Sequence, residues 1–469
     1  MVSEKHYPST IADEFQNAPL SDRRLITRLS ILASDLGDNP EKSIPDACGE
    51  LSKTKAAYDF FENKNVHWQS ILAPHVKNTI ERCKQQQLVL LIQDTTPQDF
   101  STLHKTTGLG PYSTKPKALG LLMHSVLAIN QDGVPLGLPY LNIWSRENYP
   151  KQKRHQRYQL PIQEKESNKW LLALEESSKL LPKNIKRVTI ADRESDIYEF
   201  FKKAIELEEH LVIRATHNRR ITGEHRLLYE QIEQISELGQ CLVDIPRDSE
   251  KNLPPRQAKL SIRYCPVNVC QAHARTKNPE SVSLYAVYAI EIDAPQGEEP
   301  IEWLLLTTLP VTDVTEAVQK IKWYRERWKI ERFHFTLKSG CKVEELQFET
   351  AERLIKAITL YAVIAWYLLW LTYQARSTPH LSCEVILEKT DWQILYCVAN
   401  KTKAPPEKPP TLEEVVLMFA KLGGFLGRKG DGNPGVKVIW RGFQKFNQGL
   451  MIIEFAEHLL AIPKVKGND

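Results

Sequence analysis

Hydrophobic and polar positions follow different patterns in successive parts of this chain. Residues 1–75 repeat apolar positions at helical spacing, as in "SDRRLITRLSILASDL", which has a plausible N-cap at Ser21 or Asp22. From about residue 85, short apolar runs bounded by turn residues predict strands. Residues from about 375 to 469 return to helical spacing. The pattern therefore predicts helical regions at both ends and a sheet in the middle.

The first part of the predicted sheet has a definite order of elements. "QQLVLLIQDTT", "ALGLLMHSVLAIN" and "VPLGLPYLNIW" predict three strands, and "QDG" between the last two predicts a hairpin turn. A basic loop, "KQKRHQR", and a helix, "KWLLALEESSKLL", follow. "IKRVTIADRESD" then predicts a strand that ends in Asp192, "IYEFFKKAIEL" a helix and "EHLVIRATHN" a strand. The first strand of the series ends in Asp94. Mixed sheets with crossover helices place ligands at strand ends, so both carboxylates are candidate site residues.

Residues from about 219 to 310 have a different character. "CLVDIP", "AKLSIRYCPV", "VSLYAVYAIEI" and "IEWLLLTTL" predict strands, several of them alternating, with Pro and Gly between them. We therefore expect an all-β insertion. A chain of 469 residues is long enough for more than one folding unit. We expect a helical region at 1–75, a core that contains the sheet at 76–375 and a helical region at 376–469.

Composition and charge exclude few functions. The net charge of +4, from 62 basic and 58 acidic residues, neither requires nor excludes a nucleic-acid partner. "MVSEKHYPST" at the N-terminus has no apolar signal core, and eight scattered cysteines predict reduced cytosolic thiols. "AITLYAVIAWYLLWLTY", at 357–373, is uncharged and borderline in length for a bilayer. Its charged flank favours a helix that is buried in protein.

Two local patterns resemble ligand sites but lack parts of them. "CPVNVCQAH" brings Cys265, Cys270 and His273 together in sequence. Zinc would need a fourth ligand and usually a tighter cysteine pair, so structural cysteines on strands are favoured. "GGFLGRKGDGNPG" lacks the G-x-x-x-x-G-K-[ST] order of a phosphate loop and predicts an ordinary loop.

The stretch "YRERWKIERFHFTLK", at 324–338, combines charge with aromatic residues and contains no Gly or Pro. It predicts one helix. At about 100° per residue, a stripe roughly 60° wide carries a phenol, a guanidinium, a carboxylate and an ammonium, namely Tyr324, Arg327, Glu331 and Lys338. Trp328 and Phe335 flank this stripe. Apolar residues on the other faces can pack on the sheet, namely Ile330, Phe333 and Leu337.

This stripe carries the groups that chemistry on a phosphodiester requires. The Glu331 carboxylate can bind a hard cation, while Arg327 and Lys338 suit phosphate and the aromatic faces suit unstacked bases. Asp94 and Asp192 would complete a two-metal site, for which one carboxylate is too few. Each residue alone has an ordinary explanation, as a turn residue after a strand or an ion pair on a solvated helix. Their combination favours a metal-dependent site.

On these residues the sequence resembles the DDE-class insertion-sequence transposases, whose signature is Y-x2-R-x3-E-x6-K. Within that class it is similar to the transposase of bacterial transposon five. Further blocks match in order, namely "IQDTT", "EKESNKWLLAL", "ADRESDIY", "EWLLLTTLP", "LGGF" and "IWRG". The resemblance runs from about residue 20 to near 445.

The resemblance implies an α/β fold with an RNase-H-like catalytic core, a β insertion and helical N- and C-terminal regions. It implies that Asp94, Asp192 and Glu331 are the catalytic, metal-binding triad, with Mg²⁺ as cofactor and Mn²⁺ as a substitute. The N-terminal helices of relatives bind double-stranded transposon-end DNA. Their C-terminal helices form the homodimer of the synaptic complex, so the same partners are expected here.

The resemblance also implies individual DNA contacts. Tyr324, Arg327 and Lys338 would hold the 5′ phosphate and the displaced nucleotide. The aromatic residues Trp303 and Trp328 would stack on a flipped base, since flipping costs a few kcal/mol and stacking returns about 1–3 kcal/mol per base. Basic residues elsewhere would contact DNA as well, namely Arg214, Arg24 and Arg28. The sequence departs from the family pattern at Leu25, where relatives have Arg.

The function implied is cut-and-paste transposition in the bacterial cytoplasm, at the nucleoid and without a membrane partner. It comprises strand nicking, hairpin formation, hairpin opening and strand transfer into target DNA. A nuclease of the same fold, a non-catalytic DNA-binding descendant and a two-carboxylate glycosidase are the alternatives. The long C-terminal helical region argues against the first, and the complete triad argues against the second. Arg327 and Lys338 suit phosphate better than sugar.

Overall fold

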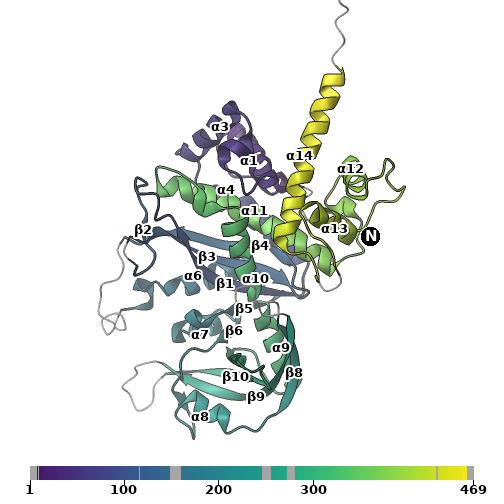
Figure 1. Cartoon of the computed structure of the whole chain (residues 1–469). Coiled ribbons are helices and arrows are strands. Elements are labelled where there is room, and N and C mark those ends of the chain that lie inside the picture. The colour runs from purple at the N-terminus through teal and green to yellow at the C-terminus, as the bar shows by residue number, and fades with distance from the viewer. Residues whose placement is uncertain are drawn as a thin grey trace, which may run out of the picture.

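The chain folds around one large mixed sheet (Figure 1). The described strands follow the order β2-β3-β1-β5-β6-β11-β10-β9-β7, with β4 paired to β3 and β8 paired to β9. This computed structural model describes residues 8, 10–115, 117–147, 160–245, 255–271, 280–428 and 431–461. The basic loop "KQKRHQR" and His273 lie outside these residues.

Half of the sheet has the RNase-H-like arrangement that the sequence predicts. Its strands are β1 (Leu88–Asp99), β2 (Gly110–Pro111), β3 (Leu119–Asn130), β4 (Pro135–Trp144), β5 (Lys186–Ala191) and β6 (His210–Arg214). β1, β3 and β4 form an antiparallel meander, and β5 and β6 run parallel to β1. The parallel strands follow the crossover helices α6 (Asn168–Leu180) and α7 (Tyr198–Glu206). The predicted hairpin between β3 and β4 is confirmed, with Gly133 at a φ of 79° in its turn.

The expected insertion extends the same sheet instead of forming a separate module. It comprises β7 (Ile221–Thr222), α8 (Leu228–Glu233), β8 (Gly239–Ile245), β9 (Arg256–Cys270), β10 (Ser281–Ile292) and β11 (Glu302–Thr307). β11 returns to pair antiparallel with β6, with Leu306 opposite Ile213. This pairing satisfies backbone groups that an edge strand would leave open. The insertion also contains the short helix α8, so it is not purely β.

Helices from both ends of the chain pack around the sheet. The N-terminal elements are η1 (Ile11–Phe15), α1 (Arg23–Asp38), α2 (Ile44–Cys48), α3 (Leu51–Glu62) and α4 (Trp68–Lys84). The C-terminal helices are α11 (Ala351–Ser377), α12 (Lys389–Asn400), α13 (Leu412–Leu422) and α14 (Val436–Ala461). Asp22, one of the two predicted N-cap candidates, is the N-cap of α1. Its side chain accepts a hydrogen bond from the Arg24 N–H. The expected boundaries at 75 and 375 fall inside α4 and α11, because the terminal helices share one hydrophobic core with the sheet.

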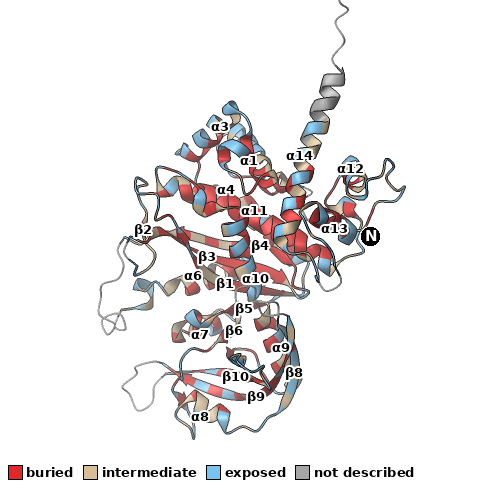
Figure 2. Cartoon of the chain, in the orientation of Figure 1, coloured by how far each residue is buried: buried red, intermediate tan, exposed pale blue. Residues whose placement is uncertain are grey.

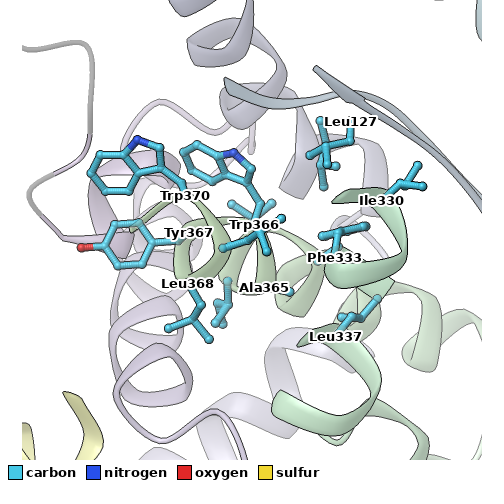
Figure 3. Close-up of a cluster of buried hydrophobic side chains, with 14 of the residues drawn as sticks. Leu127, Ile330, Phe333, Leu337, Ala365, Trp366, Tyr367, Leu368 and Trp370 are labelled. Carbon is cyan, nitrogen blue, oxygen red and sulfur yellow. The ribbon is translucent and has the colours of Figure 1, made fainter. Parts of the chain in front are cut away.

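α11 contains the uncharged run that could be mistaken for a membrane span. Its length and composition would suffice to cross a bilayer, but 94% of its apolar window is buried inside the protein. Figure 2 shows this helix buried along most of its length. In Figure 3, Trp366 and Ala365 of α11 lie near Phe333 and Leu337, with Leu127 of β3 beside them. α11 is therefore a core helix, as its charged flank favoured.

A buried charge network joins the N-terminal segment to the core. The Glu14 carboxylate lies 2.7 Å from Arg82 Nη1 and 2.5 Å from His75 Nδ1, and these side chains are at most 1% exposed. The Leu138 N–H donates to His75 Nε2 at 3.0 Å, and the Arg82 guanidinium lies 4.4 Å from the Trp366 ring centre. Burial alone would raise the pKa of Glu14, but Arg82 and His75 outweigh it and lower the pKa to about 2. Glu14 is thus the buried counter-ion of Arg82.

We expect Glu14→Gln to lower the free energy of unfolding by about 3–5 kcal/mol, because it leaves the Arg82 cation buried without its counter-ion. Denaturant unfolding at neutral pH measures this change. Glu81→Gln is the matched control on α4, since Glu81 makes an exposed pair with Lys84 at 2.7 Å. That variant should lose no more than about 1 kcal/mol. Similar small losses in both variants would show that the network does not stabilise the fold.

Candidate active site

The sheet register places two carboxylates side by side. β1 and β5 are parallel neighbours, with Ile92 opposite Ile190. Asp94 and Asp192 each lie two residues further along their strands. Neighbouring strands are about 4.8 Å apart, so the two side chains start from adjacent backbone positions.

The two carboxylates leave the sheet in different ways. The prediction that the first strand ends at Asp94 is wrong, because β1 continues to Asp99 through its pairing with β3. The pairing of β1 with β5 does end at Ile92, so Asp94 lies just beyond the contact between these strands. Asp192 directly follows β5, and its side chain accepts from the Glu194 N–H at 2.9 Å.

The helix that carries Glu331 is broken, and the prediction of one helix over 324–338 is wrong. α9 (Val314–Arg325) ends before a turn at residues 326–327, and α10 (Trp328–Phe335) continues into a π-helical turn, η4 (Thr336–Gly340). In the turn, the Arg327 N–H donates to the Tyr324 carbonyl at 3.0 Å, three residues back.

Apolar side chains on both sides of the turn pack into the same core, against different elements. Tyr324 at the end of α9 packs edge-to-face on Trp303 of β11, with ring centres 5.4 Å apart. Ile330 and Phe333 of α10 belong to the core cluster that includes α11 and β3 (Figure 3). A continuous helix at about 100° per residue therefore does not describe the face from Tyr324 to Lys338. Arg327 and Glu331 nevertheless remain paired.

The charges of Arg327 and the triad carboxylates act on one another. Arg327 Nη2 lies 2.5 Å from Glu331 Oε1. Burial and the charge of Asp192 raise the pKa of Asp94 to about 7, and Glu331 adds to this rise. The Thr95 N–H and Arg327 act in the opposite direction. The structure thus brings Asp192 and Glu331 within electrostatic reach of Asp94.

These carboxylates form a suitable donor set for a divalent cation. Hard oxygen donors match Mg²⁺ or Mn²⁺ better than zinc. A cation would also offset the burial and the carboxylate repulsion that raise the pKa of Asp94. Among the residues that the structure describes, no three acidic, His or Cys side chains are already grouped as a metal site, and the Glu331 carboxylate faces Arg327.

The predicted DNA-contacting residues occupy different environments. Arg214 lies beside Tyr324, and its Nη2 donates to the Glu302 carbonyl at 2.9 Å. Trp303 is only 7% exposed, whereas Trp328 is 50% exposed. The Arg327 guanidinium lies 5.4 Å from the Trp328 ring centre.

Two of the remaining predicted cations, Lys338 and Arg24, are paired with carboxylates outside the triad. Lys338 Nζ lies 3.1 Å from the Glu344 carboxylate, whose Oε1 also accepts from the Asp99 N–H at 2.8 Å. Arg24 and Arg28 belong to α1, and the exposed Arg24 side chain is paired with Asp22 at 2.8 Å. The sequence did not identify Glu344 as the partner of Lys338, because the pair forms beyond a π-helical turn.

A buried histidine beside the triad was also missed. His334 Nδ1 lies 3.8 Å from Asp94 Oδ2, and His334 Nε2 lies 3.0 Å from the Ser125 hydroxyl. Burial, with the charges of Lys338 and Arg327 acting in the same direction, lowers the pKa of His334 to about 3. Its position three residues after Glu331 was a usable signal, since such residues are neighbours on a helix.

Comparisons with known proteins agree with this geometry. Three family models match the chain, namely "Transposase DNA-binding" at 9–66, "Transposase DDE domain" at 158–368 and "Transposase Tn5 dimerisation domain" at 363–458. The DDE match includes Asp192 and Glu331, while Asp94 precedes it. A solved piggyBac transposase synaptic complex with hairpin DNA has 10% identity and a TM-score of 0.38, covering 97% of this chain and 80% of that one. That likeness is too distant to add to the assignment.

The chain belongs to the DDE-class transposases and is a DNA transposase. Within the class it is similar to the Tn5 transposase, because it also matches the dimerisation domain of that enzyme. The class implies dependence on a divalent metal, and the matched domains imply DNA and a second copy of the chain as partners.

We expect Asp94→Asn to stabilise the metal-free protein at alkaline pH. The pKa of Asp94 is about 7 in the folded state against an ordinary value of 3.8. The folded state therefore binds more protons between these values, and wild-type stability falls as pH rises through them. The variant avoids this loss, so its advantage should grow from about pH 4 to about pH 7 and reach about 1–3 kcal/mol at pH 8.

Thermal or denaturant unfolding in EDTA, across this pH range, measures the effect. Asp132→Asn is the control, because Asp132 lies in the exposed turn between β3 and β4. Its difference from wild type should not vary with pH. An Asp94→Asn variant that is less stable than wild type at pH 8 would contradict the raised pKa of Asp94.

Proposed function

We propose that this transposase performs cut-and-paste transposition with Mg²⁺ held by Asp94, Asp192 and Glu331, and that Mn²⁺ can replace Mg²⁺. The observation that carries the proposal is the convergence of these carboxylates, beside Arg327, from two parallel strands and α10. Bound divalent ions lower the pKa of water and stabilise charge on a departing oxygen. The chain's own residues orient the DNA for each cut.

Cations on the face of α10 and η4 suit the phosphate of the cleaved end. Arg327 and Lys338 are each paired with a carboxylate in the protein, Glu331 and Glu344 respectively. A DNA phosphate offers these cations charge-assisted hydrogen bonds of the same kind. We infer that Arg327 and Lys338, with Tyr324 and Arg214 nearby, hold the 5′ phosphate.

Trp303 and Trp328 suit the hairpin step. In this step the freed 3′-OH attacks the opposite strand, which requires a sharp bend and an unpaired base. Trp328 offers a half-exposed ring, and Trp303 packs edge-to-face on Tyr324. Stacking on aromatic rings returns about 1–3 kcal/mol per base. Water then opens the hairpin, and the same 3′-OH attacks target DNA.

The helical regions suit assembly on two transposon ends. Arg24 and Arg28 lie on α1, within the matched DNA-binding domain. α14 projects from the body of the protein in Figure 1 and lies largely within the matched dimerisation domain. We propose that two copies join through the C-terminal helices, each on its DNA end, at the bacterial nucleoid.

We expect Glu331→Gln to reduce nicking of transposon-end DNA by about 10³-fold, because a metal contribution of several kcal/mol is lost. The substrate is taken from inverted repeats that flank the gene, and cleavage is followed on a denaturing gel with Mg²⁺. Glu345→Gln is the control, since Glu345 forms an exposed pair with Lys342 at 3.6 Å. Both variants should bind the DNA. Wild-type cleavage by Glu331→Gln would overturn the assignment of α10.

We expect Trp303→Leu to reduce hairpin formation more than the first nick, since only the hairpin requires a flipped base. Leu keeps most of the apolar contact with Tyr324. Single-turnover reactions separate nick, hairpin and opened end by size. A substrate that already carries the hairpin serves as the control and should be opened at nearly the wild-type rate. Equal loss at the nick and the hairpin would count against base flipping.

A further inference from the structure

The Asp94 carboxylate is approached from two sides. The Thr95 N–H donates to Asp94 Oδ1 at 2.7 Å. On the other side, His334 Nδ1 lies 3.8 Å from Asp94 Oδ2. The second ring nitrogen of His334 lies 3.0 Å from the Ser125 hydroxyl. A chain of polar groups therefore runs from β3 through α10 to a triad carboxylate.

The sheet register explains why these groups meet. Ser125 of β3 is the direct partner of Asp94 of β1, so both side chains project from the same face of the sheet. α10 packs over this face and directs His334 between them. Ser125 is fully buried and His334 is 7% exposed. Buried polar groups of this kind are costly unless they are paired, which favours one arrangement of the chain.

The negative charge of the Asp94 carboxylate, 3.8 Å from His334 Nδ1, favours a proton on that ring nitrogen, although the separation is too long for a hydrogen bond. A lone pair on His334 Nδ1 would face a carboxylate oxygen and be repelled, whereas an N–H would be attracted. The proton therefore belongs on Nδ1. With the proton there, Nε2 accepts from the Ser125 hydroxyl. Ser125 in this way selects the form of the ring that presents a donor to Asp94.

We infer that His334, held by Ser125, is a positioning residue that orients the Asp94 carboxylate for the metal. The inference rests on the proposed function in taking Asp94 as a metal ligand. His334 itself is not a ligand in this arrangement, because its nitrogens are directed to Ser125 and Asp94. Such partners of ligating groups typically change metal affinity or activity by about 10–100-fold when they are replaced.

A second buried histidine, His124, lies on the opposite face of the sheet from His334. His124 is also fully buried and is one residue from Ser125 on β3. It projects from the opposite face of the sheet, where its Nδ1 lies 2.8 Å from the Thr95 hydroxyl and its ring packs on Trp170. His124 therefore offers a control with matched burial and a hydrogen bond to the same strand.

The test measures binding of Mn²⁺ alone to the full chain, without DNA, from the electron paramagnetic resonance signal of the free ion. His334→Leu should weaken binding by at least about tenfold. His334→Asn should restore most of the affinity, because its amide N–H lies near the position of Nδ1. Asp94→Ala defines the loss of the triad site, and His124→Asn should bind Mn²⁺ as wild type does.

Ser125→Ala tests the positioning role of His334 independently. It should weaken Mn²⁺ binding less than His334→Leu does, because the ring remains but is no longer held. This variant decides the matter if His334→Leu fails to fold, as judged by thermal unfolding. Wild-type affinity in Ser125→Ala would then overturn the inference.

Other outcomes would also overturn it. The first is wild-type Mn²⁺ affinity in a folded His334→Leu variant. The second is an equal loss of Mn²⁺ affinity in His334→Leu and His334→Asn. The third is a loss of Mn²⁺ affinity in His124→Asn as large as that in His334→Leu. Failure of the proposed function is distinguishable, because Mn²⁺ binding is measured without DNA. A chain that loses Mn²⁺ in Asp94→Ala and His334→Leu, but never cuts DNA, would retain the positioning role and refute the transposition mechanism.

Discussion

The repulsion between neighbouring carboxylates is the constraint around which this molecule is built. The register of β1 and β5 forces Asp94 and Asp192 together, and Glu331 approaches from α10. Such an arrangement opposes folding at neutral pH, as the raised pKa of Asp94 shows. The parallel pairing of β1 with β5 holds the two aspartates at corresponding positions of neighbouring strands. The Thr95 N–H and the Arg327 guanidinium offset part of the repulsion.

The rest of the fold supplies the rigidity that this site requires. α11 is buried along most of its length and provides the surface on which α10 packs. The N-terminal segment contributes Glu14, which neutralises Arg82 beside Trp366 of α11. The DNA-binding end of the chain and the catalytic core therefore share one packing unit. Stability from these distant contacts compensates for a strained site, as is common in enzymes.

Much of this organisation was predictable from sequence because it depends on local patterns. The strands, their hairpin and the capped helix at Asp22 follow from alternation, turn residues and capping. Asp94 and Asp192 stand out because each follows an apolar run. The break after Arg325 was not predictable, since no Gly or Pro marks it and tertiary packing overrides helix propensity there.

Long-range pairing accounts for the other features that sequence could not show. The return of β11 to β6 depends on residues about ninety positions apart in the chain, and no local signal encodes it. The meeting of Ser125 with His334 likewise requires both the register of β1 with β3 and the placement of α10. Sequence identifies the residue types of the site more readily than the neighbours that orient them.

In the proposed function, the paired cations would link DNA binding to assembly of the metal site. Arg327 holds the Glu331 carboxylate in the protein alone, and Lys338 is similarly held by Glu344. A phosphate that takes Arg327 would release Glu331 to join Asp94 and Asp192. Metal binding would favour the same release, so in the proposed function each ligand strengthens the binding of the other. Cleavage chemistry would then become available chiefly where transposon-end DNA is already bound.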